Sequence, residues 1–413
     1  MSKVHLGIDV LEAARRRIKV AFDDFDKICI SFSAGKDSTV MLHLVMEEAI
    51  KRNRHVGVLF IDLEAQYKLT VDCATECFEL YKDHIDPIWV CLPIHLRNAV
   101  SVFSPFWKCW DPECIKSWVR TPPEGAITDN GHFPFFHEGM EFEEFVPEFA
   151  KWYAEGKSCA FFVGIRTDES YSRFLAIASG HKRTYKGLRY TTGVDDESNS
   201  FNFYPIYDWS VQDIWIYHSR NKTLPYNGVY DRMHLAGMSP AQMRICQPYG
   251  DDQRKGLWLF HLIEPETWAR VVARVNGANS GSLYAQEHGN INGYRKVAKP
   301  PNLTWKEFAY TLIKSMPKAT REHYGNKIGV FNRWWKERGY PEGIPDEADY
   351  SLEIAKKVPS WRRVCKAILR NDYSCKSLGF SQHRSAAYQK YLDLMRRRKE
   401  ALQQQGDLAL ADG

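Results

Sequence analysis

The chain has 413 residues, of which 44% are hydrophobic and 26% charged, and its formal net charge is +5. This balance is typical of a globular protein, and no apolar run approaches the roughly 20 residues that cross a bilayer. The composition therefore argues against a membrane protein. Because the segment Met1–His5 lacks the basic stretch and apolar core of a secretory signal, we expect a cytoplasmic location and no membrane contact.

Ten cysteines are spread along the chain, and no two of them are adjacent or form a Cys-x-x-Cys pair. This arrangement is typical of reduced thiols and not of a disulfide framework. Zinc ribbons and iron–sulfur clusters use closely spaced cysteine ligands, so the sequence favours neither kind of site.

The first half of the chain alternates between helical and strand patterns. Residues 9–25 predict a helix, in which Asp9 and Glu12 stand at reciprocal capping positions, and further helices are predicted over 38–52 and 66–83. Continuous apolar runs between them are typical of strands covered on both faces. Strand, helix and strand at this spacing predict a doubly wound, mostly parallel α/β sheet with helices on both faces. The predicted strands are 27–33, 55–62, 87–92, 159–165 and 201–206.

Residues 101–157 interrupt this pattern with irregularly spaced aromatic residues among prolines and acids. We interpret them as an insertion that covers one end of the sheet, with its aromatics in a local core and not on a base-stacking surface. After residue 206 the pattern is mostly helical, with capping pairs at Ser210/Asp213 and Thr304/Glu307. The predicted divisions are an α/β domain over 1–100 and 158–270, the insertion 101–157, a linker or loop region 271–300, a basic helical domain 301–400 and a disordered tail 401–413.

Positive charge gathers near the C-terminus. Residues 351–399 contain 13 lysines and arginines but only three acids, a local excess of +10. Two interpretations stay open: a solvated helical surface, or a surface for nucleic acid or for an acidic protein partner.

The turn after the first predicted strand carries the strongest chemical signal. In an open parallel sheet, the first strand-to-helix turn presents free backbone N–H groups and the positive end of a helix dipole to a ligand. Gly35 permits close approach of an anion, Lys36 adds a positive charge, and the hydroxyls of Ser33 and Ser38 can donate to phosphate oxygens. Asp37 suits either a Mg²⁺ ion that bridges phosphates or a role in orienting Lys36. The turn is not a Walker A loop, because position 30 is isoleucine and Lys36 precedes aspartate.

The segment SFSAGKDSTVMLHL around this turn resembles the Ser-Gly-Gly-Lys-Asp-Ser loop of the N-type ATP pyrophosphatases and the phosphoadenosine phosphosulfate (PAPS) reductases. Three further segments resemble the PAPS reductase branch in the same order: VLFIDLEAQY (58–67), VGIRTDESYSR (163–173) and YPIYDWSVQDIWIYHSRNKTLPYNGVYD (204–231). Segment 247–281 and the chain length resemble the large bacterial and phage members typified by immunoglobulin-binding regulator A.

The resemblance implies an adenine nucleotide alpha-hydrolase-like fold and a site for ATP or for PAPS or adenosine phosphosulfate (APS), with Mg²⁺ at Asp37. It implies catalytic roles for Lys36, Asp37, Arg166 and Glu169. Two simpler readings stay open, in which Glu169 and Arg173 form a helical salt bridge and Asp62 caps the following helix. The residues that the resemblance places at the nucleotide are Ser31, Ser33, Ala34, Gly35, Lys36, Asp37, Ser38, Asp62, Arg166 and Arg173.

The sequence departs from the family pattern at two points. Ala34 stands where the loop has its second glycine, and a positive φ disfavours alanine by roughly 1 kcal/mol, so we expect an ordinary φ there. A sulfonucleotide reductase needs a nucleophilic cysteine in a Glu-Cys-Gly-x-His motif. Cys365 and Cys375 lack both flanks, so we expect them to be buried and inert, and we expect Cys246 to be a packed residue.

Three functions follow. The first is an ATP pyrophosphatase that cleaves at the α-phosphate to activate an acceptor, with sulfur transfer as one outcome. The second is a PAPS or APS reductase that uses Cys365 or Cys375. The third is a nucleotide-sensing regulator whose region 351–399 binds nucleic acid.

Overall fold

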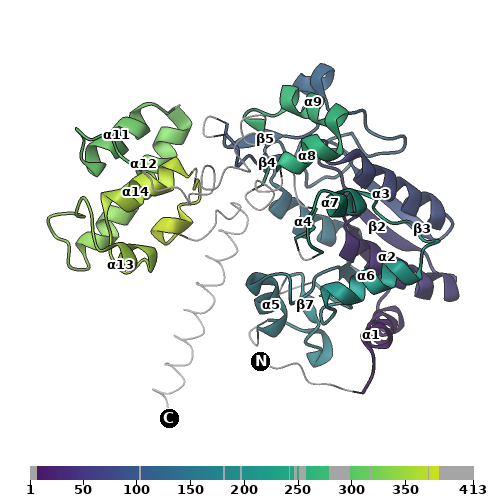
Figure 1. The fold of residues 1–413 in the computed structure, drawn as a ribbon. Coiled ribbons are helices and arrows are strands. Elements are labelled where there is room, and N and C mark those ends of the chain that lie inside the picture. Colours follow the sequence, from purple (N-terminus) through teal and green to yellow (C-terminus); the bar gives the residue numbers. More distant parts are fainter. Residues whose placement is uncertain are drawn as a thin grey trace, which may run out of the picture.

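A computed structural model gives the architecture of most of the chain. The described residues fall into a sheet-containing unit and a helical C-terminal unit, each with its own hydrophobic core (Figure 1). No helix in these ranges is both long enough and apolar enough to cross a membrane. The structure describes residues 7–101, 104–179, 182–195, 198–240, 242–245, 249–250, 257–278, 298–316, 318–370 and 372–380.

A six-stranded sheet forms the centre of the first unit, in the order β3-β2-β1-β6-β8-β7. All neighbouring pairs are parallel except β7 and β8, which are antiparallel. This arrangement confirms the doubly wound, mostly parallel sheet, and every predicted strand is present. The strands are β1 (Lys27–Phe32), β2 (Val56–Ile61), β3 (Ile85–Val90), β6 (Cys159–Val163), β7 (Thr191–Gly193) and β8 (Ser200–Phe203).

Helices cover both faces of this sheet. Phe32 and Phe60 are partners in register and point to one face, where Phe32 contacts Phe78 of α3 (Lys68–Tyr81). Side chains alternate between the faces of a strand, so Gly57 points to the opposite face. A Cβ atom on Gly57 would lie 2.4 Å from the hydroxyl of Tyr153, which belongs to α4 (Phe142–Ala154). The glycine therefore makes room for the insertion to pack on the second face.

The other helices extend the two units. Capping boxes at Ser210/Asp213 and Thr304/Glu307 confirm the predicted helix starts. The prediction of loop from residue 271 is wrong at its first positions, because a helix continues to Arg274; residues 279–297 and the predicted tail lie outside the described residues. These elements are α1 (Val10–Asp24), α2 (Lys36–Lys51), α5 (Tyr171–Ala178), α6 (Val211–Arg220), α7 (Val229–Leu235), α8 (Leu257–Ile263), α9 (Pro265–Arg274), α11 (Trp305–Lys314), α12 (Lys318–Lys336), α13 (Tyr350–Ile354) and α14 (Trp361–Leu369), with 3-10 turns η1 (Pro112–Ser117), η2 (Tyr185–Gly187) and η4 (Lys376–Leu378).

The insertion has a core of its own aromatics, as predicted. Phe133 lies within 6.1 Å, centroid to centroid, of Phe145, Phe149 and Trp152. Phe133, Phe145 and Phe149 are almost completely buried. These rings therefore fill the interior of the insertion. A small antiparallel sheet joins β4 (His95–Arg97), which precedes the insertion, to β5 (Phe106–Lys108) inside it.

A buried ion pair fastens α9 to the end of β2. Glu64 follows β2 and is completely buried, and its carboxylate accepts hydrogen bonds from Arg274 Nε (3.0 Å) and Nη2 (3.2 Å). The same carboxylate accepts from the backbone N–H groups of Trp110 (2.6 Å) and Val119 (3.1 Å) in the insertion. One carboxylate thus joins the sheet, the insertion and α9.

A buried histidine fastens the segment between α6 and α7 to α2. One ring nitrogen of His43 lies 2.7 Å from the hydroxyl of Tyr81, and the other lies 3.0 Å from the carbonyl oxygen of Pro225. Burial lowers the pKa of His43 to about 4, so the imidazole is neutral in the folded chain near neutral pH.

Replacing Arg274 by alanine is expected to cost about 3–5 kcal/mol of unfolding free energy, because it leaves the Glu64 carboxylate buried without its counter-charge. Urea unfolding measures the loss. Arg15→Ala is the matched control, since it breaks an ion pair with Glu47 whose side chains are 45% and 51% exposed, and such pairs contribute less than about 1 kcal/mol. Equal losses for the two variants would contradict the assignment of Glu64–Arg274 as an anchor.

The pKa of His43 predicts how stability depends on pH. The pKa is lower in the folded chain than in the unfolded chain, so below pH 6.5 the unfolded chain binds a proton that the folded chain excludes. The contribution of His43 to the free energy of unfolding should therefore be constant above pH 6.5. It should fall by about 3 kcal/mol as the pH drops toward 4. Denaturant unfolding at several pH values measures this pH dependence of the unfolding free energy. The variant His43→Gln should lose the decrease between pH 6.5 and 4, whereas the control His55→Gln, at an exposed position, should retain it.

Candidate functional site

The turn from Ser33 to Ser38 lies where β1 ends and α2 begins, at the carboxyl edge of the sheet (Figure 1). Gly35 is the N-cap of this 16-residue helix, so the turn faces the helix end where backbone N–H groups have no partner inside the helix. That end also carries the positive pole of the helix dipole. The position is the one predicted for the anion site.

The backbone of the turn is strained at Ala34, and here the sequence-based expectation is wrong. Ala34 has φ +52°, in the left-handed region, where an alanine costs roughly 1 kcal/mol or more. The conformation aligns the following amides with α2, and the Asn227 side chain holds it by donating to the Ala34 carbonyl oxygen (2.8 Å). The hydrogen bond from Asn227 thus stabilises, at Ala34, a backbone conformation that glycine adopts without strain.

The amide groups of the turn point at two hydroxyl oxygens. Ser33 N and Gly35 N donate to the Ser38 Oγ atom at 3.3 and 3.1 Å. Lys36 N donates to the hydroxyl of Tyr230 at 3.0 Å. The backbone N–H groups of three residues in this turn therefore point toward oxygen acceptors, as anion-binding turns require.

Gly164, at the end of β6, allows this arrangement. A Cβ atom there would lie 3.0 Å from the Ser38 Cα atom and 3.2 Å from its backbone nitrogen. Any side chain would push the head of α2 away from the sheet.

Two cations share one carboxylate beneath the turn. Lys36 Nζ donates to Asp37 Oδ2 at 3.0 Å, and Arg166 Nε donates to Asp37 Oδ1. Arg166 also donates to Asp168 and is only 3% exposed, while Lys36 is 4% exposed. The structure therefore brings Lys36, Asp37 and Arg166 together, and the Lys36 contact is the one that an orienting role for Asp37 requires.

A magnesium site at Asp37 does not fit this donor set. Both carboxylate oxygens of Asp37 accept from cationic groups, and within the described ranges no three His, Cys, Asp or Glu side chains gather as metal ligands. Mg²⁺ prefers several oxygen ligands in octahedral geometry. Asp37 therefore does not act as a metal ligand in this arrangement.

Glu169 and Arg173 form the predicted salt bridge four residues apart. Ser170 caps α5 by accepting from Arg173 N (3.2 Å), and Glu169 Oε2 accepts from Arg166 N at 3.4 Å. The pair thus supports the backbone of Arg166 beside the turn.

Asp62 follows β2 and Ser31 lies within β1, and both are held in the sheet-containing unit. Asp62 is completely buried, accepts from Trp89 Nε1 (2.9 Å) and pairs with Arg120. It does not cap the following helix, because the N-cap of α3 is Tyr67. Ser31 is half-buried inside β1, between Leu59 and Val163 of the neighbouring strands. The ligand contacts of both residues stay predictions.

Side chains of the segment 204–231 also make hydrogen bonds with the turn. They belong to Asn227, Tyr230 and His218, none of which was predicted individually from the sequence. His218 Nε2 lies 2.9 Å from the carbonyl oxygen of Lys36, and burial lowers the pKa of this imidazole. A neutral ring with its proton on Nε2 donates to that carbonyl. The available signal was the segment 204–231, which contains all three residues.

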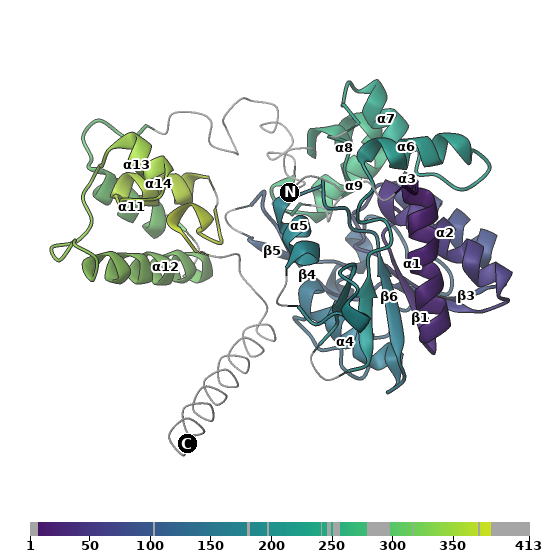
Figure 2. The same cartoon turned by 90° about the horizontal axis from the view of Figure 1, so that it is seen from below.

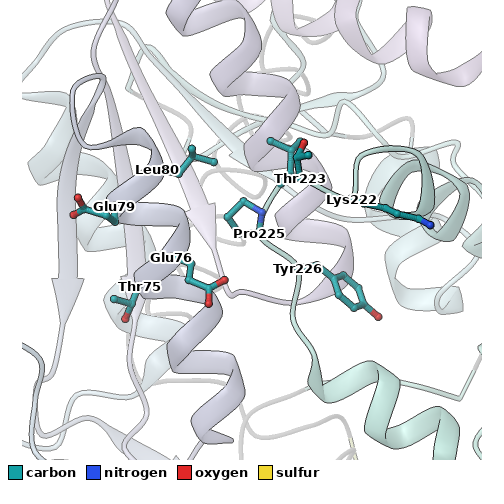
Figure 3. Close-up of a pocket in the computed structure, with 9 residues that line it drawn as sticks. Thr75, Glu76, Glu79, Leu80, Lys222, Thr223, Pro225 and Tyr226 are labelled. Atoms are coloured by element: carbon teal, nitrogen blue, oxygen red, sulfur yellow. The ribbon is translucent and has the colours of Figure 1, made fainter.

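A shallow pocket of about 760 Å³ lies outside the turn (Figure 3). Thr75, Glu76, Glu79 and Leu80 of α3 form one side, and residues 222–226 form the other. It contains none of the residues of the turn.

The two C-terminal cysteines are buried, as predicted. Cys365 donates to the Trp305 carbonyl oxygen at 3.1 Å, and burial raises the pKa values of Cys365 and Cys375 to about 12. At neutral pH both are therefore thiols and poor nucleophiles. Cys246 lies outside the described residues.

Comparisons with known proteins agree with these features. Residues 27–236 match the family described as "Phosphoadenosine phosphosulfate reductase domain", and residues 237–342 and 340–389 match "Domain of unknown function (DUF3440)". The chain is 43% identical over 399 residues to "Uncharacterized protein YbdN" of Escherichia coli (strain K12), covering 96% of this chain and 97% of that protein.

Solved structures give weaker matches. A PAPS reductase from Candida auris is 12% identical with a TM-score of 0.29, over 56% of this chain and 94% of that chain. The U34-tRNA thiolase NcsA from Methanococcus maripaludis is 11% identical with a TM-score of 0.31, over 70% and 84% of the two chains. From the matched residues 27–236 and the full-length relative, we conclude that the chain belongs to the PAPS reductase domain family.

Proposed function

We propose that the chain binds an adenylyl nucleotide, ATP or a PAPS-type sulfonucleotide, with its phosphates at the turn Ser33–Ser38. The observation that carries this proposal is the set of amides at the head of α2 that point at hydroxyl oxygens. A phosphate oxygen is a stronger acceptor than a neutral hydroxyl, because charge-assisted hydrogen bonds are shorter and roughly twice as strong. Phosphate groups would therefore take over the amides that now donate to Ser38 and Tyr230.

Lys36 and Arg166 supply the positive charge for this site. The ammonium group of Lys36 has three donors and gives one to Asp37, and the guanidinium of Arg166 has five. Asp37 thus holds both cations in place while leaving N–H groups for a ligand. Preorganised donors of this kind stabilise negative charge that develops at a transferring phosphoryl group.

The proposed reaction is attack by an acceptor on the α-phosphorus of ATP, which breaks the α–β bond and releases pyrophosphate. The acceptor becomes adenylated, and a sulfur or another nucleophile then attacks it and displaces AMP. A magnesium ion, if present, would be carried by the nucleotide phosphates, because the donor set at Asp37 does not form a metal site.

The reductase alternative is disfavoured by the buried cysteines. Reduction of a sulfonucleotide needs a thiolate that attacks sulfur, and burial raises the pKa values of both Cys365 and Cys375 to about 12. A sensor that binds nucleotide without turnover is distinguished from the enzyme by the absence of pyrophosphate release.

Lys36→Ala should weaken ATP binding at least about tenfold, equivalent to about 1.4 kcal/mol, and abolish pyrophosphate release. Lys51→Ala is the control, because Lys51 lies in the last turn of the same helix with a side chain that is 73% exposed. Calorimetry measures binding, release of labelled pyrophosphate measures turnover, and thermal melting verifies folding. Sulfite release from PAPS with thioredoxin is assayed in parallel. Sulfite formation that disappears in Cys365→Ser or Cys375→Ser would replace the proposed reaction by the reductase.

Tyr230→Phe tests how the turn is used. The ring stays in place, but the Lys36 amide loses its hydroxyl partner, so the ligand-free protein should lose about 1 kcal/mol of stability. If phosphate displaces that hydroxyl, the same variant should bind ATP more tightly by a few-fold. Weaker binding together with lower stability would mean that the hydroxyl contacts the nucleotide instead of making way for it.

A further inference from the structure

The helix α12 runs along one edge of the C-terminal unit, and α11, α13 and α14 all lie on the same side of it (Figure 2). The covered face of α12 carries the buried side chains Tyr324, Ile328 and Phe331. None of the described helices α11, α13 and α14 covers the opposite face, which is therefore the one that a partner could contact.

That face carries unpaired cations at both ends. Lys318 and Arg321 lie near the start of α12, Arg333 and Lys336 lie near its end, and all four are exposed. None of the four side chains makes an ion pair or hydrogen bond with another residue in the part of the chain that the structure describes. One acid, Glu322, lies among them. Unpaired cations of one sign on a helix face create a positive field outside it.

The cations of the predicted basic region behave differently. Arg362 pairs with Glu347 and Glu353, and Lys366 also pairs with Glu353. Arg363 donates to the carbonyl oxygens of Val358 and Ser377. In the described part of 351–399 these charges therefore hold the fold together, and the remaining cations from 384 onward lie outside the described residues.

Two glycines separate the cationic ends of α12. Gly325 and Gly329 lie inside the helix, where each costs roughly 1 kcal/mol relative to alanine. A Cβ atom on Gly325 would meet nothing within 4 Å, and one on Gly329 would meet only Arg333 Nη1 at 3.9 Å. Packing among the described residues thus gives no reason for either glycine, and their absent side chains let a partner approach the helix backbone.

The spacing places these features on one line. Lys318, Gly325, Gly329 and Lys336 follow one another at intervals of seven, four and seven residues, which keeps them on one helix face. Arg321 and Arg333 are twelve positions apart, or about 18 Å along the axis. Val330 and Trp334, beside this face, are 43% and 47% exposed, but two apolar side chains fall short of the wide apolar face of a helix that inserts into a membrane surface.

We propose that this face of α12 binds the sugar–phosphate backbone of a nucleic acid. Lys318 and Arg321 contact phosphates at one end, Arg333 and Lys336 contact phosphates at the other, and the strand passes over the two glycines. Contacts of this type position a nucleic acid without reading its sequence. Binding should therefore be sequence-tolerant and strongly salt-dependent.

Fluorescence anisotropy of the full-length chain with labelled duplex DNA, duplex RNA and single-stranded RNA, each at several salt concentrations, tests the proposal. The double variant Arg321→Glu/Arg333→Glu should weaken binding at least tenfold and reduce the salt slope by about 2, since each phosphate contact contributes about 1 to that slope. Lys19→Glu/Lys51→Glu is the matched control, because it makes the same charge change at exposed positions in α1 and α2. The three probes show which nucleic acid is preferred.

Gly325→Gln separates function from folding. Glutamine favours helix over glycine, so the variant should melt at a higher temperature while its side chain obstructs the strand and weakens binding several-fold. No binding to any probe at low salt, or equal losses for the α12 and control variants, would overturn the proposal. So would binding to anionic lipid vesicles without binding to nucleic acid. ATP binding measured on the same variants should be unchanged, which separates this result from the fate of the proposed nucleotide site.

Discussion

The unsatisfied amides at the head of α2 are the constraint on which the first unit depends. A helix start leaves backbone N–H groups without intrahelical partners, and a buried one must find acceptors elsewhere. Here Ser38 Oγ accepts from two of these amides, and a distant residue, Tyr230, accepts from Lys36 N. Asn227, also distant in sequence, donates to the Ala34 carbonyl oxygen. Gly164 leaves the space that lets the head of α2 pack against the end of β6. The requirement to satisfy one helix end thus fixes β6, α7 and the strained turn together.

The boundary between the two matched families does not coincide with the boundary between the two cores. Glu264, in the second matched stretch, accepts from Lys68 N (2.7 Å) and Leu69 N (3.0 Å) and so caps α3 in the first. Arg274, in the same stretch, pairs with Glu64. Residues 257–278 therefore complete the α/β unit, and the separate core begins with α11.

The sequence predicts the sheet well because its information is local. Continuous apolar runs identify each parallel strand, and capping pairs identify the starts of α6 and α11. The site is less predictable because its geometry depends on distant contacts. The left-handed Ala34 depends on Asn227, and the burial of Arg166 depends on Asp37, so neither follows from neighbouring residues. In the basic region, Glu353 of α13 pairs with Arg362 and Lys366 of the next helix, α14, so the periodicity within one helix does not predict these pairs.

The cations of this chain fall into two physical classes, and the class decides what each can bind. Lys36 and Arg166 are buried and held by Asp37, so they are fixed in position, poorly screened by salt and suited to one compact anion. The exposed cations of α12 are solvated and screened by salt, and in the proposed complex they would gain binding energy mainly by releasing counterions from a polyanion. Salt should therefore separate the two activities, because raising ionic strength weakens contacts at α12 much more than contacts at the head of α2. A protein with both classes of cation can bind a small nucleotide with an affinity that depends little on salt, while its affinity for a long polyanion changes with ionic strength.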